Sequence, residues 1–138
     1  FIYSVYTFFS LTPYQYTYLN IFSGKFSESH KKFESDYFST SIIELLKKTQ
    51  FEKDKHKKIA LCGLGKGHIK YVLKKYKFKN ITIVPLEDNY DYIMMTNRVY
   101  VDPNKDDFKT CYEEFTGTTI SSVERMGLNL SLIRRKNI

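Results

Sequence analysis

From residue 55 onward, short apolar runs alternate with a helical period of hydrophobic residues. Residues 59–62 form a continuous apolar run, and residues 81–84 form a second run that is apolar and β-branched. Both runs are typical of buried strands. Between them, hydrophobic residues recur at the spacing of one helix face: Ile69, Val72, Leu73 and Tyr76. The order strand, helix, strand predicts a parallel crossover connection.

Another helix is predicted upstream of this unit. Ser41 stands three residues before Glu44, which is the capping-box arrangement that satisfies free amides at a helix start. Apolar residues then follow at helical spacing, and the basic residues Lys47 and Lys48 complement the negative end of the helix dipole. We expect this helix to end near Gln50.

The last third of the chain predicts three more elements. Residues 91–96 read as a strand, and the hydrophobic residues of 108–115 recur at helical spacing. Residues 119–135 predict a terminal hairpin that turns at Met126 and Gly127. In its second strand, leucines alternate with polar residues, as expected for a strand with one buried face.

The chain divides into three parts. Residues 1–11 carry no charge, but a complete transmembrane helix needs about 20 apolar residues. We expect residues 1–22 to be the end of a last transmembrane helix with an interfacial aromatic segment, and residues 23–40 to be a polar linker. Residues 41–138 are expected to form an α/β fold, a small Rossmann-like three-layer domain with a C-terminal hairpin. The alternative is that the apolar start is a strand or helix of a soluble domain.

The chain is basic, with a formal net charge of +7 over 138 residues. A basic surface attracts phosphates and anionic lipid head groups. However, the abundant Lys, Asn, Ile, Tyr and Phe residues all have A/T-rich codons, so a biased genome also accounts for this composition. The lysine-rich face within residues 70–79 is surrounded by no recognised nucleic-acid-binding module. We therefore expect a solvated helix face and no nucleic-acid partner.

The most specific motifs lie early in the chain. Residues 12–20 read TPYQYTYLN, and residues 33–38 read FESDYF. This combination resembles the segment after the last membrane span in polyprenyl-phosphate-sugar-dependent glycosyltransferases, the multi-span family that includes bacterial relatives of the protein mannosyltransferases. Thr12 and Phe38 depart from that family, which usually has His and Trp there. The resemblance extends more loosely to three later stretches: residues 59–62, 91–98 and 123–128.

The resemblance implies a parent membrane enzyme, a hexosyltransferase that moves a sugar from a polyprenyl-phosphate carrier to a lipid or protein acceptor. In such enzymes an acidic residue of an early extracytoplasmic loop is the base that activates the acceptor. That loop would lie upstream of this chain. The resemblance therefore implies a non-catalytic domain on the periplasmic or extracytoplasmic side of the membrane, with no cofactor. Its partners would be membrane lipid and, through the upstream domain, the polyprenyl-phosphate sugar.

Six motif positions would lie near the membrane face in such an enzyme. We expect their first role to be structural, fixing the chain as it leaves the bilayer, ahead of direct contact with substrate. They are Tyr14, Gln15, Tyr18, Asn20, Asp36 and Tyr37.

A different function is suggested by the glycine-rich turn at residues 63–68, which reads GLGKGH between a predicted strand and a predicted helix. This is where a Rossmann-like enzyme binds a nucleotide or S-adenosylmethionine, because the backbone approaches the ligand at the helix N-terminus. The fingerprint would need glycine at His68, and a phosphate loop would need Ser or Thr at Gly67. A glycine turn used for close packing is the simpler interpretation.

Metal and cysteine chemistry are weakly indicated. His30, His56 and His68 are far apart in the sequence and have no partners at metal-ligand spacing. Cys62 and Cys111 fall on predicted core faces, where cysteines are more often free and buried. In an extracytoplasmic domain the same two residues could form a disulfide, but the sequence leaves their separation open.

Overall fold

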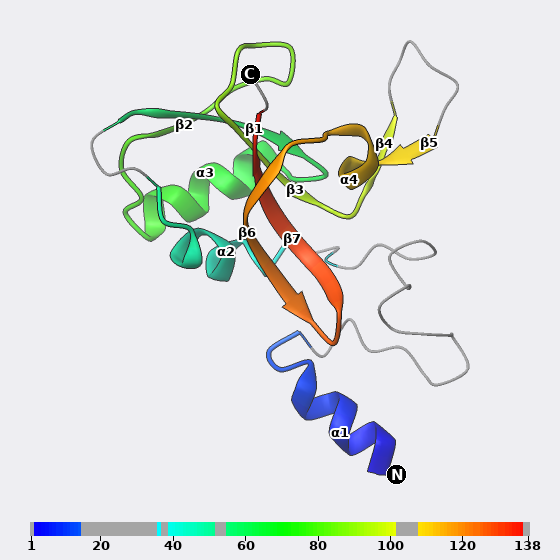
Figure 1. Cartoon of the computed structure of the whole chain (residues 1–138). Helices are drawn as coiled ribbons and strands as arrows, with labels where there is room; N and C mark the ends of the chain where they lie inside the picture. The colour runs from blue at the N-terminus through cyan, green and yellow to red at the C-terminus, as the bar shows by residue number, and fades with distance from the viewer. Residues whose placement is uncertain (1, 15–35, 37–38, 52–54, 102–107, 137–138) are drawn as a thin grey trace.

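The protein is a mixed α/β structure centred on one five-stranded sheet (Figure 1). The computed structural model describes residues 2–14, 36, 39–51, 55–101 and 108–136. Across the sheet the strand order is β2-β1-β3-β7-β6. The strands are β1 (Lys57–Cys62), β2 (Ile81–Ile83), β3 (Tyr92–Thr96), β6 (Thr118–Arg125) and β7 (Leu128–Arg135).

The predicted crossover is confirmed. Strands β1 and β2 are parallel and are joined through helix α3 (Lys66–Lys75), whose buried residues are Ile69, Val72 and Leu73. Tyr76, the fourth residue of the expected apolar stripe, instead follows the helix as its cap and is 37% exposed. Strand β3 is parallel to β1 on the side opposite β2, so the predicted strand at 91–96 is also confirmed.

The terminal hairpin is confirmed as well. Met126 and Gly127 connect β6 and β7 and both have positive φ, at 51° and 76°. A two-residue turn with this backbone matches the twist of antiparallel strands. Ser131 is fully buried, although the alternating pattern predicted that its side chain faces solvent. The simple alternation fails because both faces of β7 are covered and because the pairing with β6 shifts register between Asn129 and Ser131. Leu128 and Leu130 therefore join one hydrophobic cluster and Leu132 joins the other.

Two helices differ from the expected pattern. Helix α2 (Ile42–Lys48) begins after Ser41 as predicted, but the expected capping box is wrong, because the side chain of Ser41 makes no capping hydrogen bond to the first amides of the helix. A capping box occurs instead at α4 (Cys111–Glu114), between Thr110 and Glu113. The helix expected over 108–115 is therefore only this short one.

The residues before α4 are extended rather than helical. They form β5 (Phe108–Thr110), which pairs antiparallel with β4 (Val99–Val101) in a separate two-stranded sheet.

Hydrophobic clusters lie on both faces of the main sheet. The larger cluster joins α2 and α3 to the sheet and includes Leu45, Ile69 and Ile59, which are all fully buried. The smaller cluster contains Cys111 of α4 and Ile93 of β3. Two-sided burial explains why the central strands are apolar at successive positions.

Helix α1 (Ile2–Ser10) extends away from the sheet at the end of the molecule opposite the C-terminus (Figure 1). Within the described residues, no helix has both the length and the apolar character that crossing a bilayer requires. The expected boundaries at residues 22 and 40 border segments 15–35 and 37–38, which lie outside the described residues.

Candidate functional site at the junction of α1 and α2

The end of α1 is fixed into the main fold by buried residues. Leu11 is fully buried and Tyr14 is 4% exposed, and both belong to the large hydrophobic cluster with α2 and α3. Thr7 is also buried, and its hydroxyl donates to the carbonyl of Tyr3 at 2.8 Å, within the helix. The chain therefore passes from an exposed helix directly into the core.

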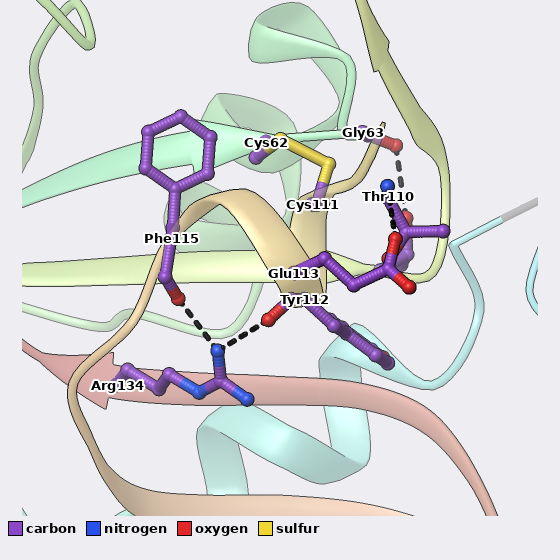
Figure 2. The surroundings of a disulfide bond; sticks show 9 residues. Cys62, Gly63, Thr110, Cys111, Tyr112, Glu113, Phe115 and Arg134 are labelled. Atoms are coloured by element: carbon purple, nitrogen blue, oxygen red, sulfur yellow. Dashed lines mark hydrogen bonds between the residues drawn. A yellow bond between two sulfur atoms is a disulfide. The ribbon is translucent and has the colours of Figure 1, made fainter. Parts of the chain in front are cut away.

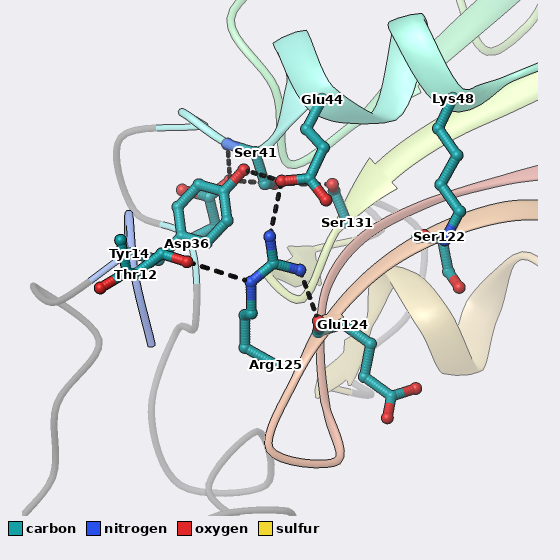
Figure 3. A network of polar contacts seen from close by, with 10 residues as sticks. All are labelled: Thr12, Tyr14, Asp36, Ser41, Glu44, Lys48, Ser122, Glu124, Arg125 and Ser131. Atoms are coloured by element: carbon teal, nitrogen blue, oxygen red, sulfur yellow. Dashed lines mark hydrogen bonds and ion pairs between the residues drawn. The ribbon is translucent and has the colours of Figure 1, made fainter. Parts of the chain in front are cut away.

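A polar network joins three segments at this junction (Figure 3). The Tyr14 hydroxyl donates to Oε2 of Glu44 on α2 at 2.7 Å. Nη2 of Arg125, at the end of β6, donates to the same carboxylate oxygen at 2.8 Å. The Arg125 guanidinium also lies 5.1 Å from the centre of the Tyr14 ring, within cation–π distance. One carboxylate thus links α1, α2 and the terminal hairpin.

Burial, followed by the hydrogen bond to Glu44, raises the pKa of Tyr14 well above its ordinary value of 10.0. The phenol is therefore protonated at neutral pH and acts as a hydrogen-bond donor. The described contacts of this network are two hydrogen bonds to Glu44, one of them also an ion pair, and a cation–π contact.

Asp36 organises the start of α2 next to this network (Figure 3). Its side chain, in a residue that is 2% exposed, accepts hydrogen bonds from the backbone N–H groups of Thr40 and Ser41, each at 3.0 Å. The Ser41 hydroxyl donates to the same carboxylate and is also hydrogen-bonded, at 2.6 Å, to the hydroxyl of Ser131 on β7. The Ser41 hydroxyl therefore binds Asp36 and Ser131 of the sheet instead of the first amides of α2, which explains the missing capping box.

An open groove of about 530 Å³ lies between the end of α1 and α2. Among the lining residues that the structure describes, Glu44 is the acidic one, and it is paired with Arg125. Lys47 is the other charged residue of this described lining, and it is exposed. The groove thus combines an apolar surface with one cationic side chain at its border. Its lining residues are Pro13, Tyr14, Thr40, Ile43, Glu44 and Lys47.

The structure brings together two of the six motif positions. Tyr14 and Asp36 both lie at this junction, both are buried, and the side chains of both make hydrogen bonds to α2 or its first turn. The other four positions lie outside the described residues: Gln15, Tyr18, Asn20 and Tyr37. Sequence reasoning missed the role of Arg125, although Arg125 stands in the resembling stretch 123–128, and it assigned Glu44 to a capping box.

The glycine-rich turn is closely packed. Gly63 has a φ of +70°, and a Cβ there would lie 2.8 Å from both Cβ of Arg98 and Oγ1 of Thr96. The Thr96 hydroxyl donates to the carbonyl of Gly63 at 3.0 Å. Gly65 precedes α3 as its N-cap, and a Cβ at Gly67 would meet nothing within 4 Å. Gly63 is therefore required by the contact between the ends of β1 and β3.

The two cysteines form a disulfide, which is one of the two alternatives that the sequence left open (Figure 2). Their Cα atoms are 5.8 Å apart, and the bond connects the end of β1 to the start of α4. Nη1 of Arg134 donates to the carbonyls of Tyr112 and Phe115, at 2.7 and 2.6 Å, and so holds the other end of α4 on β7. Sequence spacing could not reveal this pairing because 49 positions separate the two cysteines.

Within the described residues, no group of three His, Cys, Asp or Glu side chains is arranged to hold a metal ion. Comparison with protein-family models, with curated proteins and with solved structures finds no match to this chain.

Proposed function

We propose that this chain is the non-catalytic, extracytoplasmic C-terminal part of a membrane glycosyltransferase that uses a polyprenyl-phosphate sugar as donor. The resemblance of residues 12–20 and 33–38 to that family motivates the proposal. The parent enzyme would transfer its sugar to a lipid or protein acceptor. The base would lie in an early loop upstream of this chain.

The observation that carries the proposal is the exposed apolar surface of α1. Ile2 is 84% exposed, Phe9 is 71% exposed and Tyr6 is 62% exposed, and the helix carries no charged residue. An exposed, uncharged helix is unfavourable in water and favourable in lipid. At a rise of about 1.5 Å per residue, its nine residues extend roughly 13 Å, less than half of the hydrocarbon core. In this proposal, upstream sequence completes the span.

The disulfide between Cys62 and Cys111 supports the extracytoplasmic side. Disulfides persist in oxidising compartments, including the bacterial periplasm, and are rare in the cytosol. The bond lies in the core, with both residues at most 2% exposed, which is typical of a structural disulfide.

We also propose that residues 41–138 are a small Rossmann-like three-layer domain with a C-terminal hairpin. Support comes from the parallel arrangement of β2, β1 and β3 and from the apolar clusters on the two faces of the sheet. In this proposal α2 and α3 form one outer layer and α4 forms the other.

In this proposal the domain positions other parts of the enzyme and catalyses no reaction itself. Three contacts join the domain to the segment after α1: Tyr14 donates to Glu44, Arg125 donates to the carbonyl of Thr12, and the Arg125 guanidinium lies over the Tyr14 ring. We propose that this connection holds the domain over the outer face of the membrane, where it borders the acceptor side of the cleft.

The membrane location is tested with the full-length protein in its own cells. The protein should stay in the membrane fraction through alkaline carbonate extraction. After acid trapping, Cys62 and Cys111 should resist maleimide until a reductant is added. Release by carbonate, or two reactive thiols in trapped cells, would contradict the proposal.

The reaction is tested in membranes that contain the full-length protein and radiolabelled polyprenyl-phosphate hexoses. Label should pass to a lipid or protein acceptor, and replacing the acidic residue of the early loop should abolish transfer. Truncation of the enzyme after its last membrane span should lower the rate of sugar transfer without abolishing it, because the proposed catalytic base lies upstream.

A nucleotide or S-adenosylmethionine enzyme is the second candidate. It is favoured by one observation: the turn after β1 leads directly into α3 beside the parallel strand β3. Against it, Thr96 and Arg98 pack on Gly63 where a ligand would approach. If this candidate is right, isothermal titration of the wild-type chain with S-adenosylmethionine or nicotinamide cofactors should release heat of binding, and Gly65→Val should abolish it. If the wild-type chain gives no heat of binding, the candidate is wrong.

A further inference from the structure

A group of lysines and tyrosines lies beside the groove, where the ends of α2 and α3 meet. Nζ of Lys47 on α2 is 5.1 Å from the centre of the Tyr76 ring, which follows α3. Nζ of Lys75 is 5.6 Å from the ring centre of Tyr71 and 5.8 Å from that of Tyr76. We call these four residues the basic–aromatic cluster: Lys47, Tyr71, Lys75 and Tyr76.

The cluster is open to solvent and its charge has one sign. Tyr71 is 60% exposed and Tyr76 is 37% exposed, and both lysines are exposed. Helix α3 contains no acidic residue. On α2 the acidic residue is Glu44, and Arg125 pairs with it. The cluster is therefore complementary to anions.

The cluster is also continuous with the apolar surface of α1. Lys47 lines the groove together with Pro13 and Tyr14, which lie in the turn after the end of α1 at Ser10. The surface thus changes from exposed apolar side chains on α1, through a mostly apolar groove, to tyrosines and lysines. Tyrosine suits the boundary between hydrocarbon and water, since its ring is apolar and its hydroxyl is polar.

We propose that the groove and the basic–aromatic cluster bind the head groups of anionic phospholipids in the leaflet that contains α1. The Lys47 and Lys75 ammonium groups contact lipid phosphates, and Tyr71 and Tyr76 lie at the level of the glycerol backbone. This inference rests on the proposed membrane location of α1 and adds the lipid class that the domain recognises. A basic surface that binds nucleic acid would not need the apolar continuation.

The test compares two double variants of the full chain in a vesicle flotation assay. Lys47→Gln with Lys75→Gln removes both charges of the cluster. The control, Lys58→Gln with Lys136→Gln, removes two charges at another place on the surface. Lys58 and Lys136 lie close together there, because the backbone N–H groups of both donate to Asp91. Each variant lowers the formal net charge from +7 to +5, so general attraction changes equally. The control site includes a comparable contact, since Nζ of Lys136 is 4.8 Å from the Tyr90 ring centre.

The wild-type chain should float with phosphatidylcholine vesicles and bind more tightly when phosphatidylglycerol is included. Each lysine near an anionic surface contributes about fivefold, so the cluster variant should lose roughly 25-fold in affinity for the anionic vesicles. The control variant should lose less than about twofold, because screening limits charges far from the bilayer to a small contribution. Lys47→Arg with Lys75→Arg should bind like wild type, and circular dichroism should show equal folding in all variants.

Each other outcome is informative. Equal losses in the two double variants would overturn the cluster as the binding surface. Equal binding of wild type to vesicles with and without phosphatidylglycerol would overturn the inference and leave the proposed function standing. Wild type that floats with neither vesicle would contradict the membrane location of α1, and with it the proposed function.

Discussion

Reduction of the disulfide between Cys62 and Cys111 should destabilise the protein strongly. The bond closes a loop whose ends are 49 positions apart. In the chain-entropy model, opening a loop of this length returns about 4 kcal/mol of conformational freedom to the unfolded chain at 25 °C. For a chain of 138 residues the loss corresponds to a fall of roughly 14 °C in the melting temperature.

The measurement is urea unfolding of the full chain in a mild detergent, followed by circular dichroism with and without reductant. Reductant should move the wild-type midpoint to that of the double variant Cys62→Ala with Cys111→Ala. The same reductant should leave the double variant unchanged, because it contains no other cysteine.

The reasoning is refuted if reductant leaves the wild-type midpoint in place. It is also refuted if both thiols react with maleimide in denaturant before any reductant is added. Either result would show that the two cysteines are not bridged, and the argument for an oxidising compartment would be lost with the bond.

Two further predictions concern Gly63 and the buried tyrosines. Gly63→Ala should lower the free energy of unfolding by about 1–2 kcal/mol because of the left-handed backbone, and further because the new methyl group would meet Thr96. Gly67→Ala should instead stabilise α3 by about 0.5–1 kcal/mol. Thermal unfolding measures both variants, and equal melting temperatures would contradict the packing role of Gly63. Burial raises the pKa of Tyr14 and of Tyr112, so the folded state holds these protons more tightly than the unfolded state, and stability should fall as the pH rises above about 10. Urea unfolding across alkaline pH should show this fall, and a variant with phenylalanine at both positions should show a flatter one.

The sequence predicted the regular elements well where one local pattern decided them. The parallel strands and the helix between them followed from apolar runs and helical spacing, and the hairpin followed from the turn at Met126 and Gly127. These patterns involve residues close in sequence, whose preferences the fold did not override.

The predictions failed where a residue outside the local pattern competed for a side chain. Ser41 and Glu44 have capping-box spacing, but the Ser41 hydroxyl binds Asp36 and Ser131, and the Glu44 carboxylate binds Arg125. The helix expected over 108–115 is shortened because residues before Cys111 pair with β4. Local propensity is a weak preference that tertiary contacts override.

The amino-acid sequence by itself determined the strands of the main sheet, the main helices, the uncharged surface of α1 and the basic charge, since each follows from the order of neighbouring side chains. Only the tertiary structure decided which distant groups meet: Cys62 with Cys111, and Tyr14 and Arg125 with Glu44 across 30 and 81 positions. The physical reason is that packing of the sheet and helices brings such groups together, and no periodic pattern records a contact between segments far apart in the chain.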